Sequence, residues 1–174
     1  MLVYFADLAH DHFKVNQYTP TGIGYLTAYS KFKLGNHVEF RLFKSVNKLL
    51  DTYEKEKPDL VGLSNYTWNI GLSKFAGSFI KKRDPSLPII MGGPNIRIDE
   101  KGIEEFLRKT EYVDTYCMFA GELSVYEILK FLLNQPRNQR TANDLRNHIT
   151  NGCYSIYNDR LIGNSNYTRP DDLD

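Results

Sequence analysis

The chain has few cysteines, no long apolar run and no excess of charge of either sign. Cys117 and Cys153 are its only cysteines, and two thiols so far apart in the sequence make neither a disulfide framework nor a C-x-x-C metal pair. No stretch approaches the roughly 18 apolar residues that a membrane-spanning helix needs. The apolar start at Met1 breaks at Asp7, which is too short for a secretion signal. We therefore expect a cytoplasmic protein with reduced thiols.

The charge balance also excludes classes of partner. Lysine and arginine total 22 against 21 aspartate and glutamate residues, so the formal net charge is +1. Such a balance produces no global field that would concentrate nucleic acid or anionic lipid, and we expect neither partner. The sequence also lacks G-x-G-x-x-G and G-x-x-x-x-G-K-[ST], which argues against a dinucleotide or nucleoside triphosphate site.

Short apolar runs alternate with amphipathic stretches up to Pro136, an order typical of βα units wound around a parallel sheet. The runs are rich in Val, Ile, Tyr or Phe and continuous enough for a sheet covered on both faces. The predicted strands are Leu2–Phe5, Val38–Phe43, Leu60–Leu63, Ile89–Met91 and Tyr112–Phe119. With 174 residues the chain can bury one core. We expect an α/β, Rossmann-like (flavodoxin-like) sandwich of three layers around a five-stranded parallel sheet.

Helical spacing of apolar residues predicts helices between these strands. The sheet-facing positions of one such helix are Leu72, Phe75, Ala76, Phe79 and Ile80. Its opposite face carries Lys74, Lys81 and Lys82, which we expect to be in solvent. Similar spacing predicts helices that end before Pro58 and Pro136, and Thr21–Lys33 forms a less regular helix.

The carboxyl-terminal part is more polar. A short helix is predicted there, with Ala142, Leu145 and Ile149 on one side. The turn residues Asn158-Asp159 predict an edge hairpin, whose strands are Cys153–Tyr157 and Arg160–Ile162. We expect residues 1–150 to form the sandwich, and residues 151–174 to form the hairpin and an acidic linker.

Polar and glycine-rich loops follow three of the predicted strands. In an open parallel sheet, ligands bind beyond the carboxyl ends of the strands. Glycines let a backbone approach a large flat ligand, while hydroxyl and amide groups bond its rim. The loops are Ser64-Asn-Tyr-Thr-Trp-Asn69, Gly92-Gly-Pro-Asn95 and Ala120-Gly-Glu-Leu123. An isolated Gly-Gly-Pro is more often a simple tight turn, but three such loops at one edge predict a ligand site.

Five segments together point to a known family. They are Pro20-Thr-Gly-Ile-Gly-Tyr-Leu26, Lys57-Pro-Asp-Leu-Val-Gly-Leu-Ser64, Ile90-Met-Gly-Gly-Pro94, Gly121-Glu122 and Arg169-Pro-Asp-Asp-Leu-Asp174. In their order and spacing the chain resembles the amino-terminal cobalamin-binding domain of cobalamin-dependent radical S-adenosylmethionine (SAM) proteins, methyltransferases among them. The resemblance implies a corrin on the strand carboxyl ends and a nucleotide tail in a slot between the later loops. The cofactor-binding residues that it implies are Thr21, Gly22, Ser64, Asn65, Tyr66, Thr67, Gly92, Gly93, Pro94, Gly121 and Glu122.

The chain departs from that resemblance at two places. Many relatives have Gly-Glu-Gly-Glu where this chain has Phe119-Ala-Gly-Glu122. The D-x-H-x-x-G motif, which supplies an imidazole to cobalt in other cobalamin domains, is absent, since Asp7-Leu-Ala-His10 and Asp11-His12 have another spacing. A lone loop histidine is more often a surface residue than a ligand. We expect cobalt without a protein histidine and keep His10 or His12 as the alternative.

Two further residues of these loops have more than one interpretation. Trp68 follows a strand end, where it could cover the corrin, contact a partner or fill local core. Glu122 could contact the ligand or cap its own helix.

The resemblance further implies a radical SAM catalytic module as partner, in cis or in trans, with SAM and a 4Fe-4S cluster. Two cysteines cannot build the C-x-x-x-C-x-x-C site of such a cluster, so we expect a cofactor carrier rather than a complete catalyst. Methyl transfer or related radical chemistry would belong to the assembly. The acidic end suggests that the natural chain continues past Asp174. Two alternatives stay open: a cobalamin-free interaction domain, and a small hydrolase or transferase using Ser64, which lacks a G-x-S-x-G context.

Overall fold

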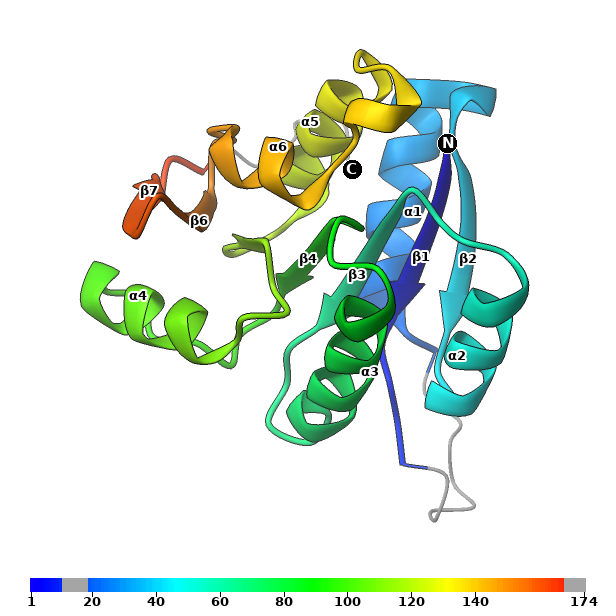
Figure 1. Cartoon of the computed structure of the whole chain (residues 1–174), viewed down its shortest axis with the longest axis horizontal. Coiled ribbons are helices and arrows are strands. Elements are labelled where there is room, and N and C mark those ends of the chain that lie inside the picture. Colours follow the sequence, from blue (N-terminus) through cyan, green and yellow to red (C-terminus); the bar gives the residue numbers. More distant parts are fainter. Residues whose placement is uncertain (11–18, 168–174) are drawn as a thin grey trace.

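The structure, a computed structural model, describes residues 1–10 and 19–167 and is built on one sheet. Its strands are β1 (Leu2–Ala6), β2 (Glu39–Phe43), β3 (Leu60–Ser64), β4 (Ile89–Gly92), β5 (Thr115–Cys117), β6 (Cys153–Tyr157) and β7 (Arg160–Gly163). They lie in the order β2-β1-β3-β4-β5-β6-β7. The first five strands run parallel, and β6 and β7 add an antiparallel hairpin to the edge (Figure 1). The predicted α/β fold with a parallel sheet and a carboxyl-terminal hairpin is confirmed.

Helices cover both faces of this sheet (Figure 1). They are α1 (Thr21–Leu34), α2 (Val46–Lys55), α3 (Ile70–Arg83), α4 (Glu100–Lys109), α5 (Glu122–Leu133) and α6 (Ala142–Asn147). Side chains alternate across a strand, so Phe5 of β1 packs in one core with Ile23 of α1 and Val125 of α5. Tyr4 packs in the other core, with Leu49 of α2 and Ile80 of α3. Every residue of β3 is buried, as its continuous apolar run predicts.

Several details differ from the sequence-based expectations. β5 is shorter than the predicted strand over 112–119, because its pairing with β4 covers only the residues from Thr115 to Cys117. Phe75, predicted to face the sheet, is 57% exposed. Ile149 is also exposed, since α6 ends at Asn147 before reaching it. Helix α4 was not predicted, because charged residues dominate its short sequence.

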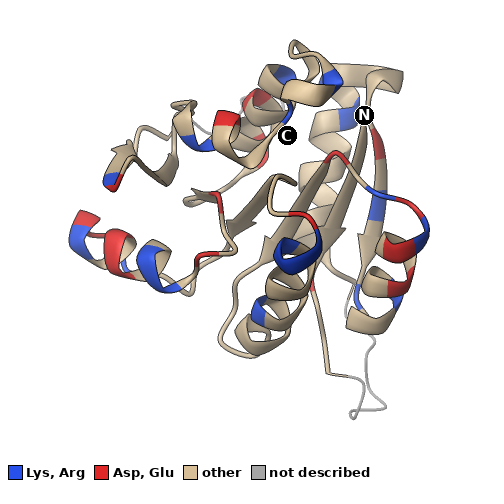
Figure 2. Ribbon diagram, viewed as in Figure 1, with Lys and Arg blue, Asp and Glu red and all other residues tan. Residues whose placement is uncertain are grey.

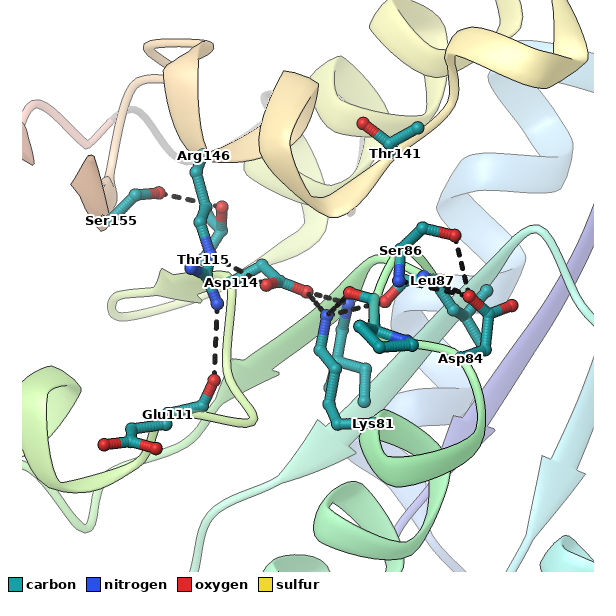
Figure 3. A network of polar contacts seen from close by, with 12 residues as sticks. Lys81, Asp84, Ser86, Leu87, Glu111, Asp114, Thr115, Thr141, Arg146 and Ser155 are labelled. Atoms are coloured by element: carbon teal, nitrogen blue, oxygen red, sulfur yellow. Dashed lines mark hydrogen bonds and ion pairs between the residues drawn. The ribbon is translucent and has the colours of Figure 1, made fainter. Parts of the chain in front are cut away.

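A buried polar network lies at the amino ends of β4 and β5 and involves Lys81, which we expected in solvent (Figure 3). The carboxylate of Asp114 is fully buried. It accepts hydrogen bonds from Lys81 Nζ at 2.6 Å, from the Ile89 N–H at 2.7 Å and from Arg146 Nε at 2.8 Å. The network joins α3, β4, the start of β5 and α6, and thus fixes the end of the sheet opposite the predicted ligand site.

Within the sheet, charged residues occur only on the two edge strands, β2 and β7. Helices α2 and α4 carry residues of both signs, while β1, β3, β4 and β5 carry none (Figure 2). None of the helices in the described residues has both the length and the apolar content that crossing a bilayer requires.

Candidate functional site

A cavity of about 170 Å³ lies at the carboxyl ends of the parallel strands, where α1 and α5 meet the sheet. Glycines and apolar side chains make up most of its wall. Residues from β1, β3, β4 and β5 reach it, as the strand-end rule for open parallel sheets requires. Pockets for drug-sized ligands are about 300–1,000 Å³, so this cavity can take a ring-sized part of a larger ligand. The rest of such a ligand would lie on the open edge of the sheet.

Most of the predicted site residues line this cavity: Gly22, Ser64, Tyr66, Gly92, Gly93, Gly121 and Glu122. Thr21, Thr67 and Pro94 are exposed outside its wall, and Asn65 is buried beneath it. His10 is exposed and is not among the lining residues. His12 and the segment 169–174 lie outside the described residues.

The loop that follows β4 runs directly against the end of β3. Gly93 has φ +131°, a conformation that favours glycine, and a Cβ there would lie 2.5 Å from the backbone oxygen of Asn65. A Cβ on Gly92 would lie 3.1 Å from the backbone oxygen of Cys117. The two glycines therefore make a close turn and also leave this side of the cavity without side chains.

A buried hydrogen-bond network holds that loop in place. The hydroxyl of Tyr116 donates to the Gly93 carbonyl at 2.7 Å and accepts from Asn65 Nδ2 at 3.0 Å. Asn65 Nδ2 also donates to the Asn95 carbonyl at 2.8 Å. Burial raises the pKa of Tyr116, so its hydroxyl keeps its proton and remains a donor. Asn65 thus supports the glycine loop from below.

A second network surrounds Asp7, which follows β1 and lines the cavity. Its Oδ1 accepts from Ser64 Oγ at 2.7 Å and from Asn69 Nδ2 at 3.0 Å. Burial and the charge of Asp7 raise the pKa of Tyr66, whose hydroxyl stays protonated and can donate to a ligand. Neither Asp7 nor Asn69 is among the cofactor-binding residues expected from the sequence, although Asn69 ends the predicted loop after β3. The signal for Asp7 was its place at a strand end, the same signal that selected Ser64.

Glu122 is the first residue of α5, and its carboxylate faces an unusual environment. Its Oε2 atom is buried and has no hydrogen-bond partner among the described residues. The N-cap of α5 is Gly121, which has no side chain, and the Glu122 Oε2 atom makes no capping hydrogen bond among the described residues. Buried polar atoms are nearly always paired, and an unpaired one costs about 1–3 kcal/mol. Because Glu122 lines the cavity, a hydrogen-bond donor on a ligand would satisfy this oxygen.

Aromatic side chains stand at the rim. Trp68 is 62% exposed and stacks on Tyr66 with ring centroids 4.4 Å apart, so it does not fill local core. Phe119 lines the cavity and has φ +55°, a left-handed conformation that favours glycine. It occupies the first position of the segment Phe119-Ala-Gly-Glu122, where many members of the resembling family have glycine. The backbone at Phe119 thus has a conformation that suits glycine.

Comparisons with known proteins agree with this geometry. No family model matches the chain. It is 33% identical over 73 residues to the cobalamin-dependent radical SAM methyltransferase TokK of Streptomyces tokunonensis, a match that covers 42% of this chain and 10% of TokK. It is 32% identical over 72 residues to the 2-(S-pantetheinyl)-carbapenam-3-carboxylate methyltransferase of Streptantibioticus cattleyicolor, covering 41% and 10%. The matched part is thus about a tenth of each relative.

Solved structures share the fold over a longer stretch. The cobalamin-dependent SAM radical enzyme OxsB, with aqua-cobalamin and SAM bound, matches 97% of this chain and 22% of its own, with a TM-score of 0.69 and 17% identity. The methanol:cobalamin methyltransferase complex MtaBC of Methanosarcina barkeri matches 83% of this chain and 50% of its own, with a TM-score of 0.58 and 15% identity. The sequence and fold matches confirm the predicted resemblance: the chain is homologous to a domain of the cobalamin-dependent radical SAM methyltransferases.

Proposed function

We propose that the chain binds cobalamin at the carboxyl ends of its parallel strands and holds it toward a radical SAM module, in cis or in trans. The observation that carries the proposal is the cavity itself, which combines a wall of glycines with the unpartnered Glu122 oxygen at this edge of the sheet. Its size suits the base of the nucleotide tail, and the larger corrin would lie on the open edge. Bound cobalamin would supply a cobalt centre that carries a methyl group between SAM and a substrate.

The lining residues have distinct roles in this proposal. Gly92 and Gly93 let the ligand approach the backbone. The carboxylates of Asp7 and Glu122 would accept from amide groups of the corrin or its tail, and the Tyr66 hydroxyl would donate to an acceptor. No described histidine lines the cavity, and no three His, Cys, Asp or Glu side chains gather as a metal site within residues 1–10 and 19–167.

The domain boundaries follow from the same proposal. Residues 1–150 would carry the cofactor, while the hairpin and linker of 151–174 would lead toward the module. The chain covers only 22% of OxsB and about a tenth of TokK. The radical reaction, its SAM and its 4Fe-4S cluster would then belong to the radical SAM module, whether in cis or in trans.

Titration of the protein with hydroxocobalamin tests the proposal directly. We expect cobalamin to stay with the protein through gel filtration with a base-off absorption spectrum, because the nucleotide base would occupy the cavity rather than cobalt. Trp68 is the only tryptophan of the chain, and it stands on the cavity-lining Tyr66. Its fluorescence should therefore fall saturably as the absorbing corrin binds.

Histidine variants are the matched controls for this titration. Replacing His10 and His12 by alanine should leave the base-off spectrum unchanged, and a changed spectrum would identify a protein ligand to cobalt. The proposal is wrong if no cobalamin is retained at concentrations well above micromolar. The binding free energy would then be weaker than about 8 kcal/mol. The cobalamin-free interaction domain would then be the better description, with the exposed Trp68 and Phe119 at its contact face.

Glu122→Gln should weaken cobalamin binding about tenfold, as expected when an amide replaces a charged hydrogen-bond acceptor. The shape of the side chain is retained, and the folded protein should be about as stable as the parent, since the buried Oε2 atom has no hydrogen-bond partner to lose among the described residues. The change is measured by the same fluorescence titration.

Glu127→Gln provides a control on the same helix, because Glu127 pairs with Lys130 on the exposed side of α5. It should bind as the parent protein does. An affinity equal to the parent's in Glu122→Gln would show that the Glu122 carboxylate does not contact the ligand.

A further inference from the structure

Cys117 and Cys153, distant in the sequence, are neighbours in the fold. They lie opposite each other on β5 and β6. Both are free and buried, and the thiol of Cys153 donates to Cys117 Sγ with the two sulfurs 3.5 Å apart. Cys117 also lines the cavity, whereas Cys153 lies behind it and is not among the lining residues.

The strand pairing already has the geometry of a cross-strand disulfide. The Met118 N–H donates to the Gly152 carbonyl at 2.8 Å, so Cys117 and Cys153 form the adjacent, non-hydrogen-bonded pair of an antiparallel ladder. Cα atoms of such pairs are about 4.5 Å apart, and disulfides accept about 4.4–6.8 Å. Side-chain rotation alone can bring the sulfurs from 3.5 Å to the bonded distance of about 2.05 Å.

We propose that Cys117 and Cys153 form a redox-active dithiol that small, uncharged disulfides oxidise through the cavity, and that a ligand in the cavity slows this oxidation. The second half rests on the proposed function, because it needs cobalamin to occupy the cavity. The first half rests only on the position of the two thiols.

The order of reaction follows from which thiol the cavity exposes. Cys117, as thiolate, attacks one sulfur of the small disulfide and releases one small thiolate, which leaves a mixed disulfide on Cys117. Cys153 then loses its proton and attacks the Cys117 sulfur, releasing the second small thiolate. The two protein thiols have given up two protons and two electrons, and the small disulfide has become two thiols.

The environment of Cys153 makes the second step, its attack on the Cys117 sulfur, slow at neutral pH. Its hydrogen bond to Cys117 and its burial raise the pKa of the Cys153 thiol well above the usual range. The second step should therefore speed up as the pH rises. Both thiols should persist in the reduced state until a disulfide reagent enters the cavity.

Hydroxyethyl disulfide is a suitable probe because it is small and uncharged. After incubation of the folded protein and alkylation of remaining thiols, intact mass should show the loss of two hydrogens and no alkylation, and peptide mapping should join Cys117 to Cys153. In Cys153→Ser, one mercaptoethanol adduct should accumulate on Cys117. In Cys117→Ser, Cys153 should remain reduced.

Two outcomes would refute the proposal that Cys117 and Cys153 form a redox-active dithiol. One is a folded parent protein that stays fully reduced while its urea-unfolded form reacts. The other is an adduct on Cys153 in Cys117→Ser that forms as fast as the adduct on Cys117 in Cys153→Ser. Circular dichroism of both variants verifies that they are folded.

The effect of the ligand is tested by repeating the oxidation with hydroxocobalamin at a concentration that saturates the Trp68 quenching. Cross-linking should slow by about fivefold or more, the usual lower range of coupling between sites. An unchanged rate with cobalamin demonstrably bound would refute the coupling. Absence of any bound cobalamin would refute the proposed function. The cross-linking result without ligand would still show whether Cys117 and Cys153 form a redox-active dithiol.

Discussion

Asp114→Asn is expected to lower the free energy of unfolding by about 3–5 kcal/mol, the usual cost of removing one partner from a buried ion pair. Asparagine keeps the shape of the side chain, but it leaves Lys81 and Arg146 without their counter-charge at the amino ends of β4 and β5 (Figure 3). Burial raises the pKa of Asp114 and lowers that of Lys81, so each charge is costly there without the other. Urea denaturation followed by circular dichroism measures the change.

Two variants separate charge pairing from other effects of the substitution. Asp159→Asn makes the same chemical change in the ion pair with Arg108, where Asp159 is 88% exposed, and should cost less than about 1 kcal/mol. Adding Lys81→Met to Asp114→Asn should restore part of the lost stability, because the cation that was left unpaired is removed. If Asp114→Asn alone is as stable as the parent, the network does not anchor this end of the sheet.

The Asp114 network marks the limit of what helical periodicity can predict. The spacing of Leu72, Ala76 and Ile80 correctly placed one face of α3 on the sheet. The same spacing placed Lys81 in solvent, because a local pattern contains no information about a carboxylate that comes 33 residues later. The prediction for Phe75 was wrong for the opposite reason: its spacing suits the core, but no element among residues 1–10 and 19–167 buries its side chain, which is exposed.

The strand-end rule predicted more of the candidate site than periodicity could. It needs only the order of strands and the residues after them, so Ser64, Gly92 and Glu122 could be read directly from the sequence. The rule could not predict which of these residues are buried. Asn65 was expected to border the ligand, but it lies buried beneath the glycine loop. The rule also could not predict the contact between Cys117 and Cys153, because that contact depends on the β6–β7 hairpin pairing with the edge of β5.

Gly93→Ala is expected to lower the free energy of unfolding by about 1–3 kcal/mol, the cost of a strained backbone, and to weaken cobalamin binding about a hundredfold, or about 3 kcal/mol. The new Cβ would lie 2.5 Å from the Asn65 backbone oxygen, and φ +131° is rare for alanine. The loop can relieve this contact only by moving away from β3. Such a movement would break the hydrogen bond from Tyr116 and displace the cavity wall.

Gly71→Ala is the matched control, since a Cβ on this α3 residue meets no atom within 4 Å. Alanine is favoured over glycine in a helix by up to about 1 kcal/mol, so this variant should be at least as stable as the parent and bind cobalamin equally well.

Tyr116→Phe separates the two effects of Gly93→Ala, because it removes the hydrogen bond to the Gly93 carbonyl without adding an atom beside Asn65. If Tyr116→Phe weakens binding as much as Gly93→Ala does, loop position controls affinity. If it binds normally, the wall must be lost through the Cβ contact itself. A Gly93→Ala protein that is less stable but binds as tightly as the parent would place the ligand elsewhere than against this loop.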